Sequence, residues 1–295
     1  MHPLALYCKS FDGDLKRVCR LATSIELHNK DDLPFDVSVP KDQIKLFRQH
    51  LPADNIHLIP DEDIIAANPA ISVEAFKDLP GHISQQIVKS EFWRLQKSEA
   101  YLCLDSDSVF IRDFHIQDYM DAAGTPYTVM NEAQEFLSEA LRLGKNHVLT
   151  DFERESKLVA QIFDRHGKHY SFGPMPMVWH SKVWGSLDNH FLKPRGVNFM
   201  DAILQAPLES RWYGEALLKY RAIPLIPCEP FFKVYHYAWQ LDLDLKHGLS
   251  NDKLAQLFTG VIYQSAWERD MDWPQEQGGL GSKIARRVKR KLGKI

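Results

Sequence analysis

Two aspartates, Asp105 and Asp107, stand one residue apart directly after the apolar run of residues 101–104. This run is too apolar on both faces for a half-exposed strand, so it predicts a buried one. Side chains two apart in an extended chain point the same way, so both carboxylates can face one hard cation while Ser106 points away. Because ligands bind at the carboxyl ends of strands in open α/β sheets, the pair predicts a divalent-metal and phosphate site. A solvated turn is the alternative for a D-x-D pattern, and the apolar run before it favours the metal site.

Other polar residues are candidates for holding a nucleotide. Lys9, Ser10 and Phe11 follow the first apolar run, in the loop where an α/β nucleotide-binding fold holds its base or ribose. Gln86 and Lys89 are three apart on a predicted helix, so they are neighbours that could reach a sugar or phosphate. Solvated positions on a helix face are the alternative for this second pair.

Two histidines late in the chain could complete a metal site. His236 follows an apolar strand-like run, and a histidine there can fold back on the aspartate pair as a further ligand. His180, beside Trp179, is the second candidate. An aromatic platform for a sugar face is one interpretation of the residues around His180, and ordinary core packing is the other.

An acceptor hydroxyl would need a general base if the reaction inverts configuration. Glu215, Asp201 and Asp151 are the acids to consider, with Glu215 first because it follows the aromatic RWYG sequence. A glutamate on a helix surface with no catalytic role is the alternative.

Strand and helix patterns alternate along the chain, which predicts a parallel sheet flanked by helices. The expected strands are residues 4–8, 35–39, 56–59, 101–104, 125–130 and 222–228, and the expected helices lie within residues 15–27, 41–50, 79–99, 131–167 and 211–220.

Composition is that of an ordinary globular protein, with 295 residues, 44% hydrophobic and 25% charged. Such a chain can form one large α/β domain or a domain with an appendage. No run of eighteen apolar residues occurs and the N-terminal sequence is unlike a secretory signal, so we expect a cytoplasmic protein. The four cysteines lack metal spacing and are expected to be reduced thiols.

The end of the chain is strongly basic. Residues 283–295 carry seven Lys or Arg and no acid, and without them the net charge falls from −3 to about −10. A uniformly basic nucleic-acid binder is therefore not expected. Ile284, Val288, Leu292 and Ile295 form a narrow apolar stripe, so residues 282–295 predict a helix lying on an anionic membrane, on the inner face. A disordered solubilising tail and a nucleic-acid patch are the alternatives.

The pattern resembles the GT-A class of nucleotide-sugar-dependent glycosyltransferases, of the bacterial cell-surface polysaccharide type. The sequences that carry the resemblance are LALYCKSFDGD, QQIVKSEFWRLQKSEA, YLCLDSDSVF and the late His236, and they cover roughly residues 1–240. The resemblance implies an α/β fold with a mostly parallel, Rossmann-like central sheet. It implies a catalytic domain over residues 1–250, with a nucleotide half over about 1–110 and an acceptor half over about 111–250. A helical extension and linker (251–281) and the basic amphipathic helix (282–295) would follow.

The same resemblance implies roles for the candidate residues. Asp105 would lie toward the ribose or nucleotide, Asp107 would hold Mn²⁺ or Mg²⁺ on the diphosphate, and His236 would complete the metal shell. The donor would be a UDP or GDP sugar, and the acceptor a glycan, lipid-linked in surface polysaccharide synthesis. The late H-x-x-G-x-K-P-W signature of glycogenin-like retaining enzymes is absent, because YAWQ follows His236. An inverting hexosyltransferase is therefore expected.

Three other functions are compatible with parts of the pattern. A haloacid-dehalogenase-like phosphatase also has an apolar strand running into D-x-D, with the first aspartate, here Asp105, as nucleophile. That motif normally opens its fold, whereas three strands are expected before it here. A sugar-phosphate nucleotidyltransferase lacks support because its glycine-rich basic loop is missing. A non-enzymatic module recruited to membranes is the third alternative.

Overall fold

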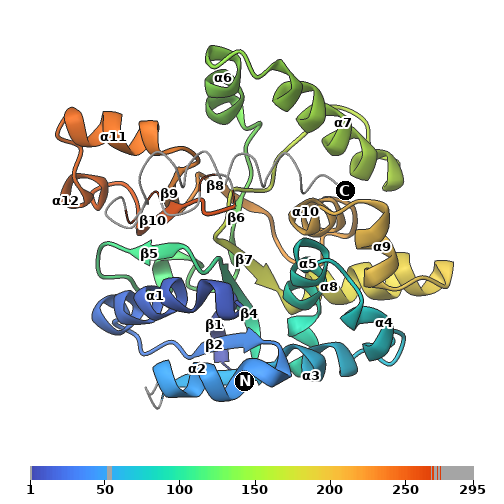
Figure 1. The fold of residues 1–295 in the computed structure, drawn as a ribbon. Helices are drawn as coiled ribbons and strands as arrows, with labels where there is room; N and C mark the ends of the chain where they lie inside the picture. Colours follow the sequence, from blue (N-terminus) through green and yellow to red (C-terminus); the bar gives the residue numbers. More distant parts are fainter. Residues whose placement is uncertain (1, 52–54, 267, 269–270, 272, 274–295) are drawn as a thin grey trace.

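The computed structural model describes residues 2–51, 55–266, 268, 271 and 273. Its central sheet has five strands in the order β3-β2-β1-β4-β7 (Figure 1). The strands are β1 (His2–Lys9), β2 (Phe35–Val39), β3 (Ile56–Pro60), β4 (Ser98–Leu104) and β7 (Met177–His180). The first four are parallel, and β7 runs antiparallel to β4 at the edge. The expected α/β fold with a mostly parallel central sheet is therefore confirmed.

The order of the strands reverses between β1 and β4. From β1 the chain adds β2 and β3 on one side, then returns to place β4 on the other side of β1. The carboxyl ends of β1 and β4 lie next to each other, since Cys8 pairs with Leu104 in the register. In open α/β sheets such a reversal opens a crevice that binds ligands.

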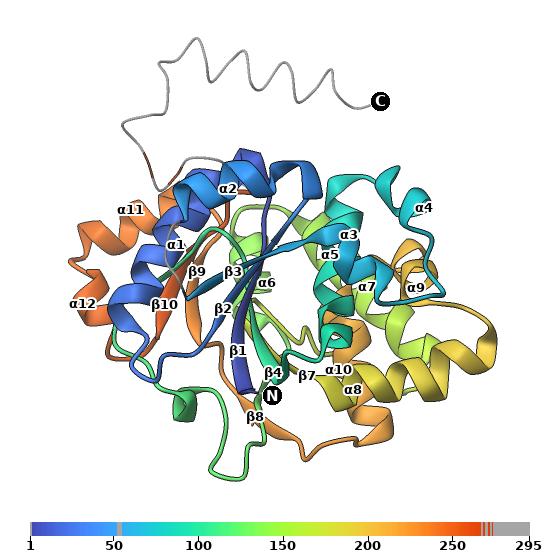
Figure 2. The same ribbon diagram turned by 90° about the horizontal axis from the view of Figure 1, so that it is seen from below.

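Helices cover both faces of this sheet. Figures 1 and 2 show α1 on one side and α5 and α8 on the other. The helices are α1 (Leu15–His28), α2 (Ile44–His50), α3 (Asp61–Ala66), α4 (Val73–Lys77), α5 (Gly81–Glu91), α6 (Gln134–Arg142), α7 (Asn146–Ile162), α8 (Ser181–Leu187), α9 (Phe199–Gln205), α10 (Glu209–Tyr220), α11 (Ala238–Lys246) and α12 (Asn251–Leu254).

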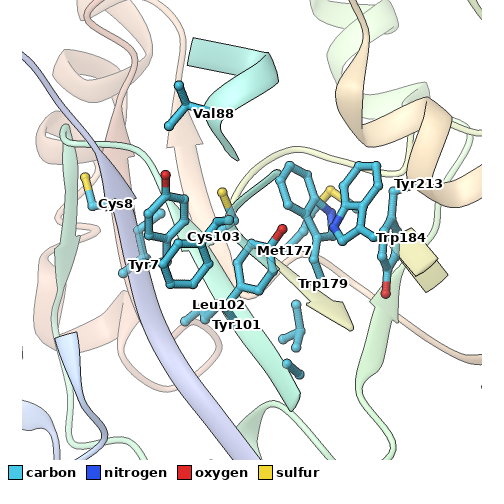
Figure 3. Packing of buried hydrophobic residues seen from close by; sticks show 14 of the residues in the cluster. Tyr7, Cys8, Val88, Tyr101, Leu102, Cys103, Met177, Trp179, Trp184 and Tyr213 are labelled. Carbon is cyan, nitrogen blue, oxygen red and sulfur yellow. The ribbon is translucent and has the colours of Figure 1, made fainter. Parts of the chain in front are cut away.

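A row of aromatic side chains forms the core between the sheet and the helices on the α5 and α8 side (Figure 3). Tyr101 meets Tyr7 and Trp179 edge to face, with ring centroids 5.7 and 5.9 Å apart. Trp179 in turn meets Trp184 at 5.2 Å, and Trp184 meets Tyr213 of α10 at 5.1 Å. Such contacts add to the free energy of area burial, so the row holds α10 firmly against the sheet. The aromatic residues near His180 thus belong to the core.

Two smaller sheets complete the fold. One has the order β5-β10-β9, formed by β5 (Ser108–Phe110), β9 (Phe232–Tyr235) and β10 (Gly260–Tyr263). The other pairs β6 (Tyr127–Val129) with β8 (Ile226–Cys228) in parallel.

The expected domain end at residue 250 is wrong, because β10 is the central strand of the β5-β10-β9 sheet. Residues 251–263 therefore belong to the folded body, while the predicted basic helix at 282–295 lies outside the described residues. Within the part that is described, no helix has the length and apolar character needed to cross a lipid bilayer.

Candidate active site

The two aspartates occupy a tight turn between β4 and β5. The backbone N–H of Ser108 donates to the carbonyl oxygen of Asp105 at 3.0 Å, so the chain reverses across the D-S-D sequence. The expectation of an extended chain here is wrong, because short polar residues favour turns. The turn still lies at the carboxyl end of β4, as predicted, and next to the carboxyl end of β1.

Asp105 forms an ion pair with a lysine of α5. Its Oδ1 lies 2.5 Å from Nζ of Lys89, whose side chain is almost completely buried. Burial acts to lower the pKa of Lys89, but the charge of Asp105 and this hydrogen bond outweigh it and raise the pKa overall. The structure thus brings together Lys89 and Asp105, two of the predicted site residues.

Backbone N–H groups of a segment much later in the sequence, residues 263–265, hold Asp107 in place. Its Oδ2 accepts a hydrogen bond from the N–H of Ser265 at 2.8 Å, and its carbonyl oxygen accepts one from Tyr263 at 3.2 Å. Its Oδ1 is buried and has no hydrogen-bond partner among the residues that the structure describes. Burial and then the charge of Asp105 raise the pKa of Asp107 to about 6. A bound cation would therefore stabilise the charged form of this carboxyl group.

Ser106 connects the aspartate turn to the start of α1. Its Oγ donates to Oδ2 of Asp14 at 3.1 Å. Asp14 also pairs with Arg17 at 3.2 Å. Sequence reasoning missed Asp14, although its place in the loop after β1 could have indicated it.

At the end of β1, Lys9 is anchored by the protein itself. Its Nζ lies 2.7 Å from Oδ2 of Asp61 and 2.7 Å from the carbonyl oxygen of Ser10. Oγ of Ser10 and Oδ1 of Asp61 are buried without a hydrogen-bond partner in the described part of the chain. Asp61 was missed by sequence reasoning, although it directly follows the third strand. Its pKa is raised by burial, against the opposing charge of Lys9.

Phe11 lies in the loop after β1 and exposes 43% of its surface. Its ring covers Gly13, where a Cβ atom would lie 2.4 Å from the ring. Glycine at this position therefore allows the ring to lie flat across the loop, where it can offer a face to a base.

Gln86 joins α5 to the start of α10. Its Oε1 accepts from the N–H of Glu209 at 3.3 Å, and its Nε2 donates to the carbonyl of His82 at 2.9 Å. Burial raises the pKa of Glu209, against the positive charge of Lys89 and together with the negative charge of Asp105. Glu209 is thus a third carboxyl near this pair, and sequence reasoning missed it. The predicted donor contact of Gln86 stays a prediction.

Glu215 is a partner of Arg165, and this argues against its expected role as a base. Its Oε1 lies 2.6 Å from Nη2 and its Oε2 lies 2.5 Å from Nε, and the carboxylate is buried. Both oxygens of Glu215 are thus committed to a bidentate pair.

The other two acids also have structural partners. Asp201 forms a capping box at the start of α9, where its Oδ2 accepts from the N–H of Asn198 at 2.9 Å. Asp151 pairs with Arg154 on the exposed side of α7 at 2.9 Å. Neither arrangement identifies a base.

The two histidines differ in position. His180 is opposite Ala100 in the sheet, five residues and so roughly 16 Å along the strand from Asp105. Its Nδ1 accepts from the N–H of Lys182. The separation from Asp105 argues against His180 as a further ligand of the aspartate pair. His236 follows β9, packs on Phe136 and has a pKa lowered to about 4 by burial and Lys233. Within the described chain, no group of three His, Cys, Asp or Glu residues could hold a metal ion, so the role of His236 stays a prediction.

Several solved structures are similar to this chain. The galactosyltransferase LgtC, in complex with donor and acceptor sugar analogues, is 14% identical, with a TM-score of 0.47 over 99% of this chain and 97% of its own. Mouse xyloside xylosyltransferase 1 is 8% identical, with a TM-score of 0.48 over 90% and 98%. The glycosyltransferase GlyE of Streptococcus pneumoniae TIGR4 is 13% identical, with a TM-score of 0.46 over 96% of this chain and 59% of its own.

No curated protein matches the sequence. One family model does match, over residues 2–222, and this span contains the whole central sheet and the aspartate turn. The chain therefore belongs to DUF6492, a family of unknown function.

Proposed function

We propose that this protein is a glycosyltransferase that moves a sugar from a nucleoside-diphosphate sugar to a glycan acceptor. The observation that carries the proposal is the position of the aspartate turn in the crevice where the strand order reverses, between the ends of β1 and β4. A ligand in this crevice would meet Asp105 and Asp107 on one side and Ser10 on the other. Carboxylates beside polar groups at such a position suit a nucleotide carried with a cation.

The residues present fit a divalent cation. Asp107 offers a buried oxygen with no hydrogen-bond partner among the described residues, and the half-exposed Asp105 offers a second carboxylate. Oxygen ligands of this kind are those that Mg²⁺ and Mn²⁺ take. Asp105 and Asp107 would hold the ion, with His236 as a further ligand. Once bound, such an ion would neutralise the negative charge that develops on a departing diphosphate.

The protein's own residues supply the other interactions. Ser10 and Asp61 each have a buried oxygen that a ribose or base could bond, and the exposed ring of Phe11 can stack on a base. Lys89 fixes the orientation of Asp105 and places a positive charge beside it. In this proposal the nucleotide would lie near the end of β1 and the diphosphate at the aspartate turn.

Glu209 replaces Glu215 in the proposal as the acceptor base. It lies in the first turn of α10 and interacts with the charges of Lys89 and Asp105, and burial raises its pKa. A general base is most effective when its pKa lies near the working pH, so a raised pKa makes a carboxylate a better base at neutral pH. An inverting transfer would use this carboxylate to accept the proton of the attacking hydroxyl.

Nucleotide binding tests the proposal directly. The protein's melting temperature should rise when UDP or GDP is added with Mn²⁺, and a nucleotide sugar should be slowly hydrolysed. Asp107→Asn should lose both effects, while Asp113→Asn, at an exposed carboxylate, should keep them. Phosphate release from simple phosphoesters, without stabilisation by nucleotides, would instead favour the phosphatase.

A peripheral membrane location is a further part of the proposal, and it rests on sequence alone. The seven basic residues of the segment 283–295 could each contribute about 1 kcal/mol near an anionic surface, enough to retain an acidic body there. A lipid-linked acceptor would be met at that surface. Vesicle co-sedimentation should show that the full chain prefers anionic over neutral lipid and that a chain ending at residue 281 does not. Equal binding by the two chains would contradict the membrane part alone.

A further inference from the structure

A second concave site lies among the helices that follow the central sheet. Its cavity of about 250 Å³ opens between the end of α7, the segment before α9, and α9 and α10. We call it the helical pocket. Phe191, Leu192 and Trp212 form its apolar floor, and Arg195, Asp201 and Gln205 lie at its rim. No residue of the aspartate turn lines it, so it is distinct from the proposed donor site.

The polar groups of the rim are held in place by the protein. The Nη1 of Arg195 donates to the carbonyl of Phe191 at 3.0 Å, and the guanidinium lies 3.8 Å from the centre of the Phe191 ring. The carboxylate of Asp201 is fixed by the capping box with Asn198. Gln205 follows one turn later on α9, so it lies beside Asp201. Fixed groups of this kind lose little entropy when they bind a ligand.

Arg195 and Asp201 do not pair with each other. They line the same small cavity with opposite charges, yet no ion pair joins them in the part of the chain that the structure describes. Hydroxyl groups of a ligand in the pocket can serve both residues, because a hydroxyl can accept from the guanidinium and a hydroxyl can donate to the carboxylate.

A single sugar ring matches the remaining features of the pocket. Ligand pockets for drug-sized molecules are typically about 300 to 1,000 Å³, so this one suits a smaller ligand. The carbon-bound hydrogens of a sugar form an apolar face that can pack on Val197, the exposed apolar side chain of the lining. Its hydroxyls would meet the rim.

The pocket is also connected to the proposed active site. Trp212 lies three residues after Glu209 on α10, so the two are neighbours on that helix. Helix α9, which carries Asp201 and Gln205, packs against α5, the helix of Lys89, and Figure 1 shows α5, α9 and α10 together. A chain of sugars could therefore extend from Glu209 to the pocket.

We propose that the helical pocket binds a sugar unit of the acceptor glycan, beyond the unit that receives the transferred sugar. The choice of an acceptor sugar rests on the proposed function, whereas the binding of a sugar can be measured without any turnover.

Saturation-transfer NMR with methyl glycosides of galactose, glucose and mannose tests the proposal on the full chain. Val197 lines the pocket and is 37% exposed, so Val197→Trp should fill the cavity from its rim without disturbing the core. Leu204→Trp is the matched control, because Leu204 is 54% exposed on α9 and does not line the pocket. At least one glycoside should give signals with the unchanged protein and with Leu204→Trp, and signals reduced severalfold with Val197→Trp.

Arg195→Leu provides a second variant that leaves the cavity open. Loss of a charged hydrogen-bond donor should weaken glycoside binding by about tenfold or more. Equal signals from the unchanged protein and both pocket variants would overturn the proposal, as would the absence of signal with every glycoside. Asp107→Asn should bind glycosides normally. If nucleotide sugars are not turned over while glycosides still bind in the pocket, the proposed function fails and the sugar site stands.

Discussion

Lys89 of α5 and Asp105 of the aspartate turn link a helix directly to the proposed diphosphate site, with 2.5 Å between Nζ and Oδ1. Lys89 is almost fully buried, so water screens its charge only weakly. The pair offsets part of the repulsion that Asp105 and Asp107 would otherwise exert on each other. The site can therefore keep two neighbouring carboxylates in the absence of a cation.

Lys89→Met should weaken nucleotide binding in the presence of Mn²⁺ by at least about tenfold, because Asp105 loses its fixed orientation. It should also destabilise the fold by about 3 kcal/mol, since one member of a mostly buried pair is left alone. Calorimetric titration and urea unfolding measure the two effects.

Lys97→Met is the matched control for this prediction. Lys97 pairs with the buried Asp36 at 2.6 Å, just before β4 and so at the far end of that strand from the turn. Its loss should lower stability and leave nucleotide binding unchanged. If the two variants lost nucleotide binding equally, Lys89 would be no more than a structural residue.

Asp107→Asn should make the protein more stable at neutral pH and inactive. The carboxyl of Asp107 has its pKa raised to about 6, so the folded protein holds this proton more tightly than the unfolded chain does. Stability from this group is then fully present below about pH 4 and is lost as pH rises through about 6. The variant has no such loss, and its gain at pH 7.5 should be of the order of 1 to 3 kcal/mol.

Melting temperatures measured between pH 4 and pH 8 check this prediction. The difference between Asp107→Asn and the unchanged protein should grow with pH across that interval. Addition of Mn²⁺ should reduce the difference by stabilising only the unchanged protein. If the difference in melting temperature were constant with pH, burial would not raise the pKa of the Asp107 carboxyl in the folded protein.

Glu215→Gln should lower the free energy of unfolding by about 3 kcal/mol, because Arg165 would lose its bidentate partner in a largely buried place. Turnover per folded molecule should stay close to normal. Glu74→Gln, at an exposed carboxylate paired with Lys77, should change neither quantity. Complete loss of turnover by folded Glu215→Gln would restore this residue as the acceptor base, in place of Glu209.

Gly214→Ala should destabilise the protein by more than 1 kcal/mol. An added Cβ on α10 would lie 2.2 Å from the ring of Phe172, so the ring or the helix must move. Gly185→Ala is a matched control, since Gly185 is also helical and its Cβ would approach Trp93 no closer than 3.8 Å. That change should be neutral or stabilising by up to about 1 kcal/mol. Chemical denaturation distinguishes the two.

Four of the five strands of the central sheet could be predicted from the sequence, because they are continuous apolar runs between helices. The antiparallel edge strand β7 was not among the expected strands. Strand 35–39 has the expected bounds, and α1 ends one residue later than expected. Strand β10 was missed because it is only four residues long and pairs with β5 and β9, which are distant from it in the sequence. Local patterns do not contain such pairings.

The candidate site could be predicted only in part for the same reason. Asp105 and Asp107 follow a recognisable strand, and Lys89 lies at a helix position that indicated a phosphate contact. Glu209 could not be found, because its place depends on a hydrogen bond to Gln86 across 123 residues. The ion pair of Glu215 could not be predicted, because its partner Arg165 lies 50 residues earlier and no local spacing connects them.

The hydrogen bond between Asp107 and Ser265 also affects the order in which parts of the chain can fold during synthesis. These residues are 158 positions apart, so the aspartate turn cannot take its final form until nearly all of the described chain has left the ribosome. The strands β1 to β4 can pair earlier, since their contacts are closer in the sequence. A nascent chain would therefore acquire its sheet before its aspartate turn is complete, and the turn could be completed only after Ser265 has emerged.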